Sequence, residues 1–460
     1  MGKWGRVMIK PRLLRLAVVS ASVAQIYLSY KIPQLLNKAG LRHDTPQQVS
    51  KRHRRNATTL YNLAARLQGL MIKPCQFLSS RADLVPDEYI EVLSRLQDKV
   101  PPRPYKEVRR AVRRELGGWP EQLYAAFDPR PIAAASLAQV HRARMHDGRD
   151  VAVKVQYPGI DRVARTDLAN MMLLARMLSR IERPFDFTPI VRELERMVPL
   201  ELDFENEGRN AETVARNLSH RSEFIVPKIV WERTSRRVLT MDFIEGFKIT
   251  DVAAMRAAGI DPLYVAQLLT EAYCEQLLIN GFFHADPHPG NLIVQPGPKI
   301  ALIDFGLSKR FPTPFRRAFV ELTRAIILKD DAATVQAFKD LGFRAKRDDP
   351  QTLIALGDAF LGRAVRENKV YADQEMVAEI NAMLTRTLKA NPVVNVPSDI
   401  VLVGRVTGLL AGIAKTLGSK VNLLDTMMPY VAMRSMTADG REAILASMTQ
   451  EERAAVGAAD

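Results

Sequence analysis

The chain has 460 residues, of which 47% are hydrophobic and 25% charged, and its formal net charge at pH 7 is +15. This composition excludes a mostly disordered protein and leaves room for two or three folded lobes, while a total of two cysteines, Cys75 and Cys274, excludes a disulfide framework and indicates a reducing compartment. The excess of basic residues predicts either a solvated basic surface or an anionic partner, and we favour an anionic membrane surface over nucleic acid because no aromatic residues alternate with the basic ones.

The N-terminal segment, residues 1–43, is basic and contains no acidic residue. Within it, Leu16–Tyr30 is an uncharged run of fifteen residues, shorter than the roughly 20 residues that a membrane-spanning helix needs. We favour a helix that lies on or dips into a membrane, held by the flanking Arg15 and Lys31. Two alternatives remain open, namely an apolar helix packed on the folded domain and a signal peptide cleaved near Ser22-Val23-Ala24.

Residues 44–125 are predicted to form a helical extension. Apolar residues between Ala57 and Phe77 recur at spacings of three and four, which is typical of a helix with one buried face. Lys73 and Gln76 lie within this stretch and matter again below.

From Phe127 onward the pattern changes to β-structure. The small residues Ala133, Ala134, Ala135 and Ser136 are predicted to form a loop between two strands, and Asp147-Gly148 predicts a tight hairpin turn. The return strand, Val151–Val155, carries Lys154. A charged side chain inside an apolar β-run is costly unless it meets an anion, so we predict that Lys154 binds phosphate. A lysine on the wet face of an edge strand would not explain the valines on both sides.

Residues 161–218 are predicted to be helical, and they include the acidic stretch from Glu201 to Glu207. A further β-run, Val238–Ile244, ends before Glu245-Gly246. The helix predicted next, Pro262–Asn280, has one apolar face and Gly281 at its C-cap.

The stretch from His284 to Arg310 carries the most specific pattern of the chain. Asp286 is followed five residues later by Asn291 in a turn rich in proline, and two short β-runs then lead to Asp304-Phe305-Gly306. Phosphoryl transfer needs a carboxylate at the acceptor hydroxyl and oxygen ligands for the metal that bridges the phosphates. Asp-x4-Asn, two strands and Asp-Phe-Gly in this order are the kinase pattern. We therefore predict Asp286 as the catalytic carboxylate, and Asn291 and Asp304 as ligands of Mg²⁺.

The upstream elements occur in the order that ATP binding by a kinase requires. Backbone N–H groups of the loop 133–136 would lie over the phosphates, and Lys154 would neutralise the α- and β-phosphates while a glutamate holds its ammonium group. The β-run 238–244 stands where a strand leads into the hinge between two lobes, so Asp242 and Ile244 are predicted to line the nucleotide site. Because ATP is a cytosolic resource, a secreted protein is disfavoured. Most of the chain after Arg310 is predicted to be helical.

These motifs resemble those of the UbiB/AarF family of atypical kinases over roughly residues 60 to 310. The family replaces the usual glycine-rich loop by an alanine-rich one, which here is the loop 133–136, and its catalytic loop matches His284–Asn291. The resemblance implies that Glu207 is the partner of Lys154. ATP and Mg²⁺ are the cofactors that it implies.

A further motif of the family, Lys-x-Gly-Gln, reads Lys73-Pro74-Cys75-Gln76 here, so cysteine replaces glycine. The resemblance implies that the helices carrying this motif cover the active site, and that Lys73 pairs with Glu201 of a Glu-x-Asp motif. Lys73, Gln76, Glu201 and Asp203 are thus predicted to form a regulatory cover. Glu201 and Glu207 are six helical positions apart, so they are predicted to point about 240° apart, which allows one acidic segment to serve both Lys73 and Lys154.

Together these features predict an α+β, two-lobed protein-kinase-like fold. We expect a small antiparallel β-sheet in the N-lobe, a mostly helical C-lobe and a helical N-terminal extension covering the active site. The expected segments are the basic terminus 1–43, the extension 44–125, an N-lobe with a helical insertion at 126–245 and a C-lobe at 246–460.

Two departures from ordinary protein kinases bear on the substrate. Ala285 stands where the H-R-D motif has arginine, and no A-P-E string follows Asp304-Phe305-Gly306. Both weigh against protein phosphorylation and favour ATP hydrolysis or phosphorylation of a small or lipid-like molecule. The resemblance implies a peripheral protein on the cytoplasmic side of a membrane, active in ubiquinone or other isoprenoid-lipid metabolism with a protein of that pathway as partner. The alternative is a nucleotide-binding pseudokinase scaffold, and the sequence predicts no oligomeric state.

Overall fold

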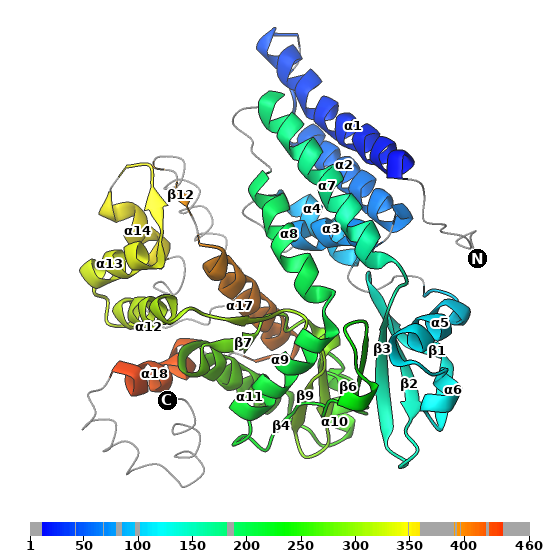
Figure 1. Ribbon diagram of the computed structural model, residues 1–460. Coiled ribbons are helices and arrows are strands. Elements are labelled where there is room, and N and C mark those ends of the chain that lie inside the picture. The colour runs from blue at the N-terminus through cyan, green and yellow to red at the C-terminus, as the bar shows by residue number, and fades with distance from the viewer. Residues whose placement is uncertain are drawn as a thin grey trace. The chain divides into compact units, whose positions relative to one another are not determined.

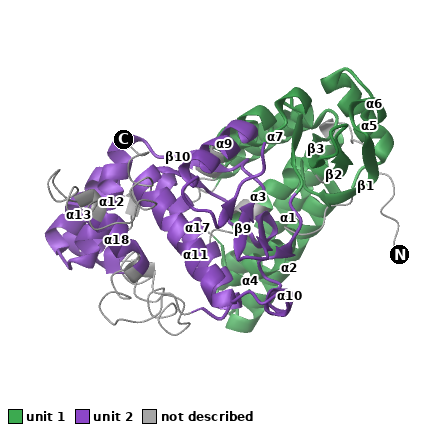
Figure 2. Cartoon of the chain, turned by 90° about the horizontal axis from the view of Figure 1, so that it is seen from below, with its two compact units in different colours: residues 1–206, 229–243 green, residues 207–228, 244–460 purple. Residues whose placement is uncertain are grey.

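The computed structural model describes residues 12–41, 43–67, 69–79, 85–96, 102–181, 188–347, 349–358, 391, 393–395, 397–419 and 423–435 (Figure 1). The chain forms two compact units, coloured separately in Figure 2. Unit 1 comprises residues 1–206 and 229–243, and unit 2 comprises residues 207–228 and 244–460. The helical continuation predicted for 359–390 and 436–460 lies outside the described residues, as do the basic residues of the first eleven positions.

Unit 1 contains an antiparallel four-stranded sheet in the order β1-β2-β3-β5. Its strands are β1 (Ala126–Ala134), β2 (Ala138–Arg144), β3 (Asp150–Gln156) and β5 (Val238–Asp242). The hairpin predicted at Asp147-Gly148 joins β2 to β3, and Gly148 has a φ of +90°, a conformation that glycine adopts without a steric penalty. The predicted strands around Lys154 and at residues 238–242 are therefore confirmed.

The predicted loop at 133–136 is partly wrong, because Ala133 and Ala134 belong to β1. They pair with Val140 and Gln139 of β2, so the loop shrinks to residues 135–137. Alanine has a low β-propensity, but pairing with a neighbouring strand outweighs it. The pairing of β1 is irregular around Pro131, where proline supplies no N–H group to the ladder.

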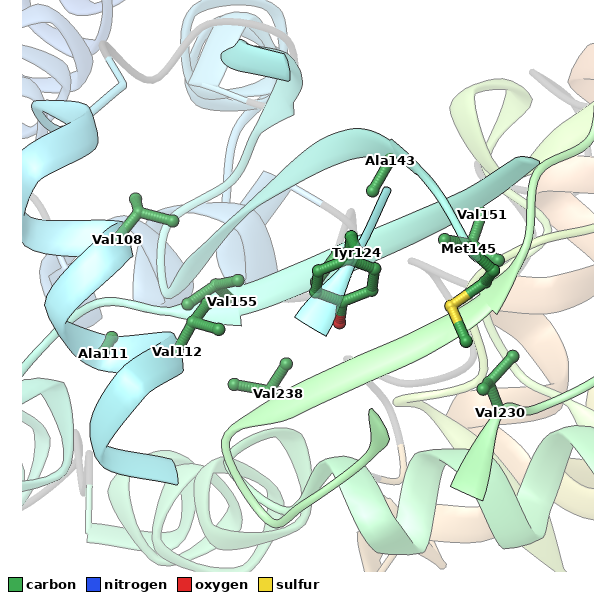
Figure 3. Packing of buried hydrophobic residues seen from close by; sticks show 11 residues of the cluster. Val108, Ala111, Val112, Tyr124, Ala143, Met145, Val151, Val155, Val230 and Val238 are labelled. Atoms are coloured by element: carbon green, nitrogen blue, oxygen red, sulfur yellow. The ribbon is translucent and has the colours of Figure 1, made fainter. Parts of the chain in front are cut away.

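One face of this sheet packs against α5 (Tyr105–Leu116), as Figure 3 shows. The buried helix residues Val108, Ala111 and Val112 recur at spacings of three and one, which places them on one side of α5. They meet valines of β3 and β5, and each fully buried valine contributes about 1.5–3 kcal/mol. Tyr124 lies in the same core and its hydroxyl group stays hydrogen-bonded, 2.9 Å from Thr240 Oγ1.

The rest of unit 1 is helical. Its longer helices are α1 (Arg12–Lys38), α2 (Pro46–Leu67), α3 (Ile72–Ser79), α4 (Asp87–Leu93), α7 (Ile160–Ile181) and α8 (Thr188–Glu201), with α6 (Pro120–Leu123) and the 3₁₀ turns η1 (Gly69–Met71), η2 (Ser94–Leu96) and η3 (Trp231–Arg233) between elements. The uncharged run 16–30 lies within α1. Val19 of α1 is buried against Leu63 and Leu67 of α2, so one face of the run packs on the folded unit. None of the described helices is long and apolar enough to cross a membrane.

The prediction of one helix through residues 201–207 is wrong. Helix α8 ends at Glu201, and α9 (Phe204–Asn217) begins three residues later, so the 240° relation between Glu201 and Glu207 does not apply. The chain turns because Asp203 Oδ1 accepts a hydrogen bond from Asn206 N and caps α9, while Phe204 N donates to Arg236 O. Pro199 lies inside the last turn of α8.

Unit 2 is mostly helical and carries short strands around its centre. Its helices are most of α9, then α10 (Val252–Ala257), α11 (Pro262–Glu275), α12 (Thr313–Ile327), α13 (Asp331–Leu341), α14 (Pro350–Gly357), α17 (Ser398–Thr416) and α18 (Leu423–Ser435). A π-helical turn, η4 (Gln276–Asn280), extends α11 to Gly281, whose φ of +60° confirms the predicted C-cap.

Two small sheets of unit 2 position the candidate site. One has the order β4-β9-β8-β6, and the other is the pair β10-β7. The strands are β4 (Phe224–Ile225), β6 (Phe247–Lys248), β7 (Phe282–His284), β8 (Leu292–Gln295), β9 (Lys299–Leu302) and β10 (Ser308–Arg310). A further two-stranded sheet, formed by β11 (Arg344–Ala345) and β12 (Val393–Asn395), lies later in the chain.

Candidate active site

Strand pairing brings the two halves of the His284–Arg310 stretch together in unit 2. His284 at the end of β7 pairs with Ser308 at the start of β10, and Ala285 N donates to Leu307 O at 2.8 Å. In the second sheet Leu292 pairs with Leu302, directly after Asn291 and shortly before Asp304. The catalytic loop and the Asp304 turn are therefore neighbours because their flanking strands are paired.

Buried His284 links these two segments. Burial lowers the pKa of His284, so the imidazole is neutral and has one N–H donor and one acceptor nitrogen. Nε2 bonds to the backbone oxygen of Asp304, which only accepts, so Nε2 carries the proton. Nδ1 then accepts from the hydroxyl group of Tyr273 at 2.6 Å. Both ring nitrogens of this histidine are therefore engaged, and it ties the backbone at Asp304 to Tyr273.

The turn after Asp286 is held by its own hydrogen bonds. Asp286 O accepts from His288 N at 2.7 Å and from Asn291 Nδ2 at 3.1 Å. His288 Nδ1 accepts from Gly290 N at 3.1 Å, which shapes the loop. Because the amide nitrogen of Asn291 is bound to the loop, its Oδ1 is the atom that remains to coordinate a metal ion.

Asp304 and Asn291 suit Mg²⁺ as hard oxygen ligands. Asp304 Oδ1 accepts a hydrogen bond from Gly306 N at 3.1 Å, and Ile303 N donates to Asn291 O at 3.1 Å. In the described part of the chain, no three His, Cys, Asp or Glu residues form a group that could hold a metal ion. One carboxylate and one amide nevertheless fit the way Mg²⁺ is held in nucleotide sites, where phosphate oxygens and water complete the coordination.

Glu207 lies beside the Asp304 turn and is 2% exposed. A Cβ added at Gly306 would lie 3.7 Å from Glu207 Oε2 and 3.4 Å from Asp304 Oδ1, so the two carboxylates face the same glycine. One helical turn further along α9, Asn210 Nδ2 donates to Phe305 O at 3.2 Å. Helix α9 thus holds Glu207 against the Asp304 turn.

The predicted nucleotide residues of unit 1 lie on its sheet. Lys154 lies in β3, where it pairs with Val140 of β2 and Leu239 of β5, and its Nζ lies 5.1 Å from the centre of the Phe204 ring. Ser136 is buried in the loop between β1 and β2. Asp242 ends β5, whereas Ile244 is the first residue of the next unit 2 segment. Lys154 and Glu207 belong to different units, and their pairing stays a prediction.

The predicted cover residues also lie in unit 1. Lys73 Nζ on α3 is 2.5 Å from Glu201 Oε2 on α8, so the structure brings this predicted pair together, and Asp203 caps the next helix. Gln76 lies in α3, and its side chain is outside the described part of the structure. Cys75, which replaces the family glycine, is buried in an apolar cluster with Ala57 and Ile72, and burial raises the pKa of its thiol to about 12.

Arg405 is the site residue that the sequence analysis missed. It lies on α17, 119 positions after Asp286, and its Nη2 donates to Asp286 Oδ1 at 2.7 Å. Asp399 in the first turn of α17 pairs with Lys309 on β10 at 2.9 Å. No local pattern connects α17 with the catalytic loop, so tertiary structure alone reveals this contact.

Known proteins match the chain along most of its length. Residues 95–338 match the family model of the ABC1 atypical kinase-like domain. AarF domain-containing protein kinase 1 of Xenopus tropicalis is 34% identical over 380 residues, covering 80% of this chain and 72% of that protein, and its namesake of Gallus gallus is 35% identical over 383 residues, covering 81% and 73%. Probable serine/threonine-protein kinase abkD of Dictyostelium discoideum is 33% identical over 387 residues, covering 83% of this chain and 55% of that protein.

A solved structure is also similar to this chain in its fold. The complex of Rv3197 with erythromycin from Mycobacterium tuberculosis aligns with a TM-score of 0.56 and 24% identity, covering 83% of this chain and 96% of that one. With the kinase-like match of residues 95–338, it confirms the predicted two-lobed kinase-like fold.

Proposed function

Because this chain belongs to the ABC1 atypical kinase-like proteins, the UbiB/AarF family that its motifs resemble, we propose that it is an atypical kinase or ATPase that uses ATP and Mg²⁺. The observation that carries this proposal is the grouping in unit 2 of Asp286, Asn291 and Asp304, with buried Glu207 beside the same turn. These groups are the ones that phosphoryl transfer needs.

Each residue has a role that follows from its chemistry. Lys154 neutralises the α- and β-phosphates and Glu207 holds its ammonium group, while the loop after β1 covers the phosphates with backbone N–H groups. Asn291 Oδ1 and the Asp304 carboxylate hold Mg²⁺, which when bound neutralises charge on the phosphate oxygens. Asp286 orients the attacking hydroxyl group or water and accepts its proton.

The acceptor that fits the sequence best is water or a small or lipid-like molecule. Ala285 is buried where protein kinases carry an arginine, and the helix α12 begins soon after β10 in place of a peptide platform. Exposed apolar residues on α1, among them Ile32 and Leu35, support a peripheral position at a membrane. We assign the cytoplasmic side because ATP is a cytosolic resource. In this setting the partners are anionic lipids and a protein of ubiquinone or other isoprenoid-lipid metabolism.

A second candidate is a nucleotide-binding scaffold without turnover. It is favoured by one observation, the ion pair between Arg405 and Asp286, which occupies an oxygen of the catalytic carboxylate.

ATP turnover separates the two candidates. We expect the wild-type protein, in the presence of Mg²⁺, to hydrolyse ATP or to transfer its γ-phosphate. The rate should be higher with anionic lipid vesicles than without them. Asp286→Asn and Asp304→Asn should each lower the rate by at least about 100-fold, since each removes a charge that acts in the transition state. If all three proteins bind ATP alike and none turns it over, the scaffold is correct. A protein acceptor phosphorylated in the same assay would refute the lipid-like acceptor.

A further inference from the structure

The ion pair between Arg405 and Asp286 is a contact of unit 2 that none of the kinase motifs contains. The side chains are 21% and 25% exposed, so the pair is partly shielded from water. A charge-assisted hydrogen bond of 2.7 Å in such surroundings is stronger than a bond between neutral groups.

This contact engages one of the two oxygens of the Asp286 carboxylate. Oδ1 accepts from Arg405, so Oδ2 is the oxygen left to orient an attacking hydroxyl group or water. The backbone of Asp286 is held separately, because its carbonyl oxygen accepts from His288 N and Asn291 Nδ2. Without Arg405 the loop would still be in place, but the carboxylate would be free to rotate about its last bond.

Helix α17 is a firm support for Arg405. Its buried face includes Val403, Val406 and Leu410, and its first turn is tied to β10 by Asp399 and Lys309. Because β10 follows the Asp304 turn and Asp286 follows β7, the two ion pairs join one helix to both halves of the site.

We propose that Arg405 is a positioning residue that holds the Asp286 carboxylate in the orientation required for phosphoryl transfer. The inference rests on the proposed function. Arg405 acts through Asp286, so its loss affects the chemical step and leaves nucleotide binding by Lys154, Asn291 and Asp304 intact. A misplacement of about 1 Å at a reacting group costs up to ~100-fold in rate.

The test is the kinetics of ATP turnover by the full chain with Mg²⁺. We expect Arg405→Gln to lower kcat about 10- to 100-fold while KM for ATP stays within about twofold. Arg405→Lys, which keeps a positive charge, should recover part of that loss. In the Asp286→Asn background, Arg405→Gln should lower kcat no further, because the group that it positions is already gone.

The matched control is Lys415→Gln, which removes an exposed positive charge from the same helix and should leave kcat unchanged. Thermal unfolding of each variant shows whether α17 stays folded. Equal kcat for the wild type and Arg405→Gln, or losses that multiply in the double variant, would overturn the proposal. A higher kcat for Arg405→Gln would identify an inhibitory contact instead. No turnover by the wild type would refute the proposed function itself, a result distinct from any of these.

Discussion

His141 in β2 is a fully buried histidine whose environment fixes its protonation state. Its Nδ1 donates to Asp128 O at 2.8 Å, and its Nε2 accepts from Gln139 Nε2 at 2.9 Å. Burial lowers the pKa of His141 in the folded protein below its ordinary value of about 6.5. The neutral imidazole is thus part of the core beside the sheet that carries Lys154.

This burial makes stability depend on pH. Below about pH 6.5 His141 binds a proton in the unfolded chain but resists protonation in the folded protein. The stability that neutral His141 contributes is therefore complete above that pH, and it is lost as the pH falls toward the pKa of His141 in the folded protein. We expect the free energy of unfolding of unit 1 to decrease from pH 7 to pH 5, and His141→Gln to flatten this decrease. Urea unfolding at several pH values measures it. The control is His146→Gln at an exposed position, and an equal flattening there would contradict the assignment.

At the scale of elements, the ion pair of Lys73 and Glu201 joins α3 to α8. Their side chains are 23% and 11% exposed, so losing one partner leaves a poorly solvated charge and costs about 2 kcal/mol, between the values of exposed and buried pairs. We expect Lys73→Gln to speed amide hydrogen exchange in α3 about tenfold or more, measured by mass spectrometry.

An exposed pair in the same helical extension serves as the control for Lys73. Arg54 and Glu91 are about half exposed and join α2 to α4, so Arg54→Gln should leave the exchange rates of its helices almost unchanged. If both variants exchange alike in α3, then the Lys73–Glu201 pair does not hold the cover in place.

Elements defined by a local pattern were predictable from the sequence. The valines around Lys154 indicated β3, and the apolar face before Gly281 indicated α11, because both signals arise within one element. The break between α8 and α9 was only partly predictable. Asp203 caps α9 through a local hydrogen bond, but Phe204 N donates to Arg236 O, which another segment supplies. In the same way Ala133 joined β1 only because β2 offered it a partner.

The candidate site shows the same division between local and tertiary signals. Asp286, Asn291 and Asp304 stand at fixed spacings in one stretch, so the sequence was sufficient to group them. Arg405 reaches Asp286 from a helix far along the chain, and its position has no motif of its own. Contacts between distant elements are therefore the part of the site that required a structure.

At the scale of the whole molecule, the N-terminal helix serves both the fold and the proposed membrane role. One face of α1 packs on the other helices of unit 1, and Arg15 there forms a buried ion pair with Asp167 at 2.5 Å. A truncation that removes α1 would therefore destabilise the helices packed on it as well as remove a membrane contact. Point substitutions on the exposed face of α1 separate the two roles.

That exposed face presents an apolar stripe formed by Leu28, Ile32 and Leu35. Their exposed fractions are 48%, 51% and 55%, and their spacing of four and three places them on one side of the helix. We expect the double variant Ile32→Glu, Leu35→Glu to bind anionic lipid vesicles at least about tenfold more weakly, because it removes apolar burial and adds repulsion. Thermal stability should not change, since neither side chain is in the core.

Leu263→Glu, at an equally exposed leucine of α11, is the matched control in vesicle flotation. Undiminished flotation of the double variant would refute a membrane role for α1, and a loss that Leu263→Glu reproduces would show a general effect of added negative charge.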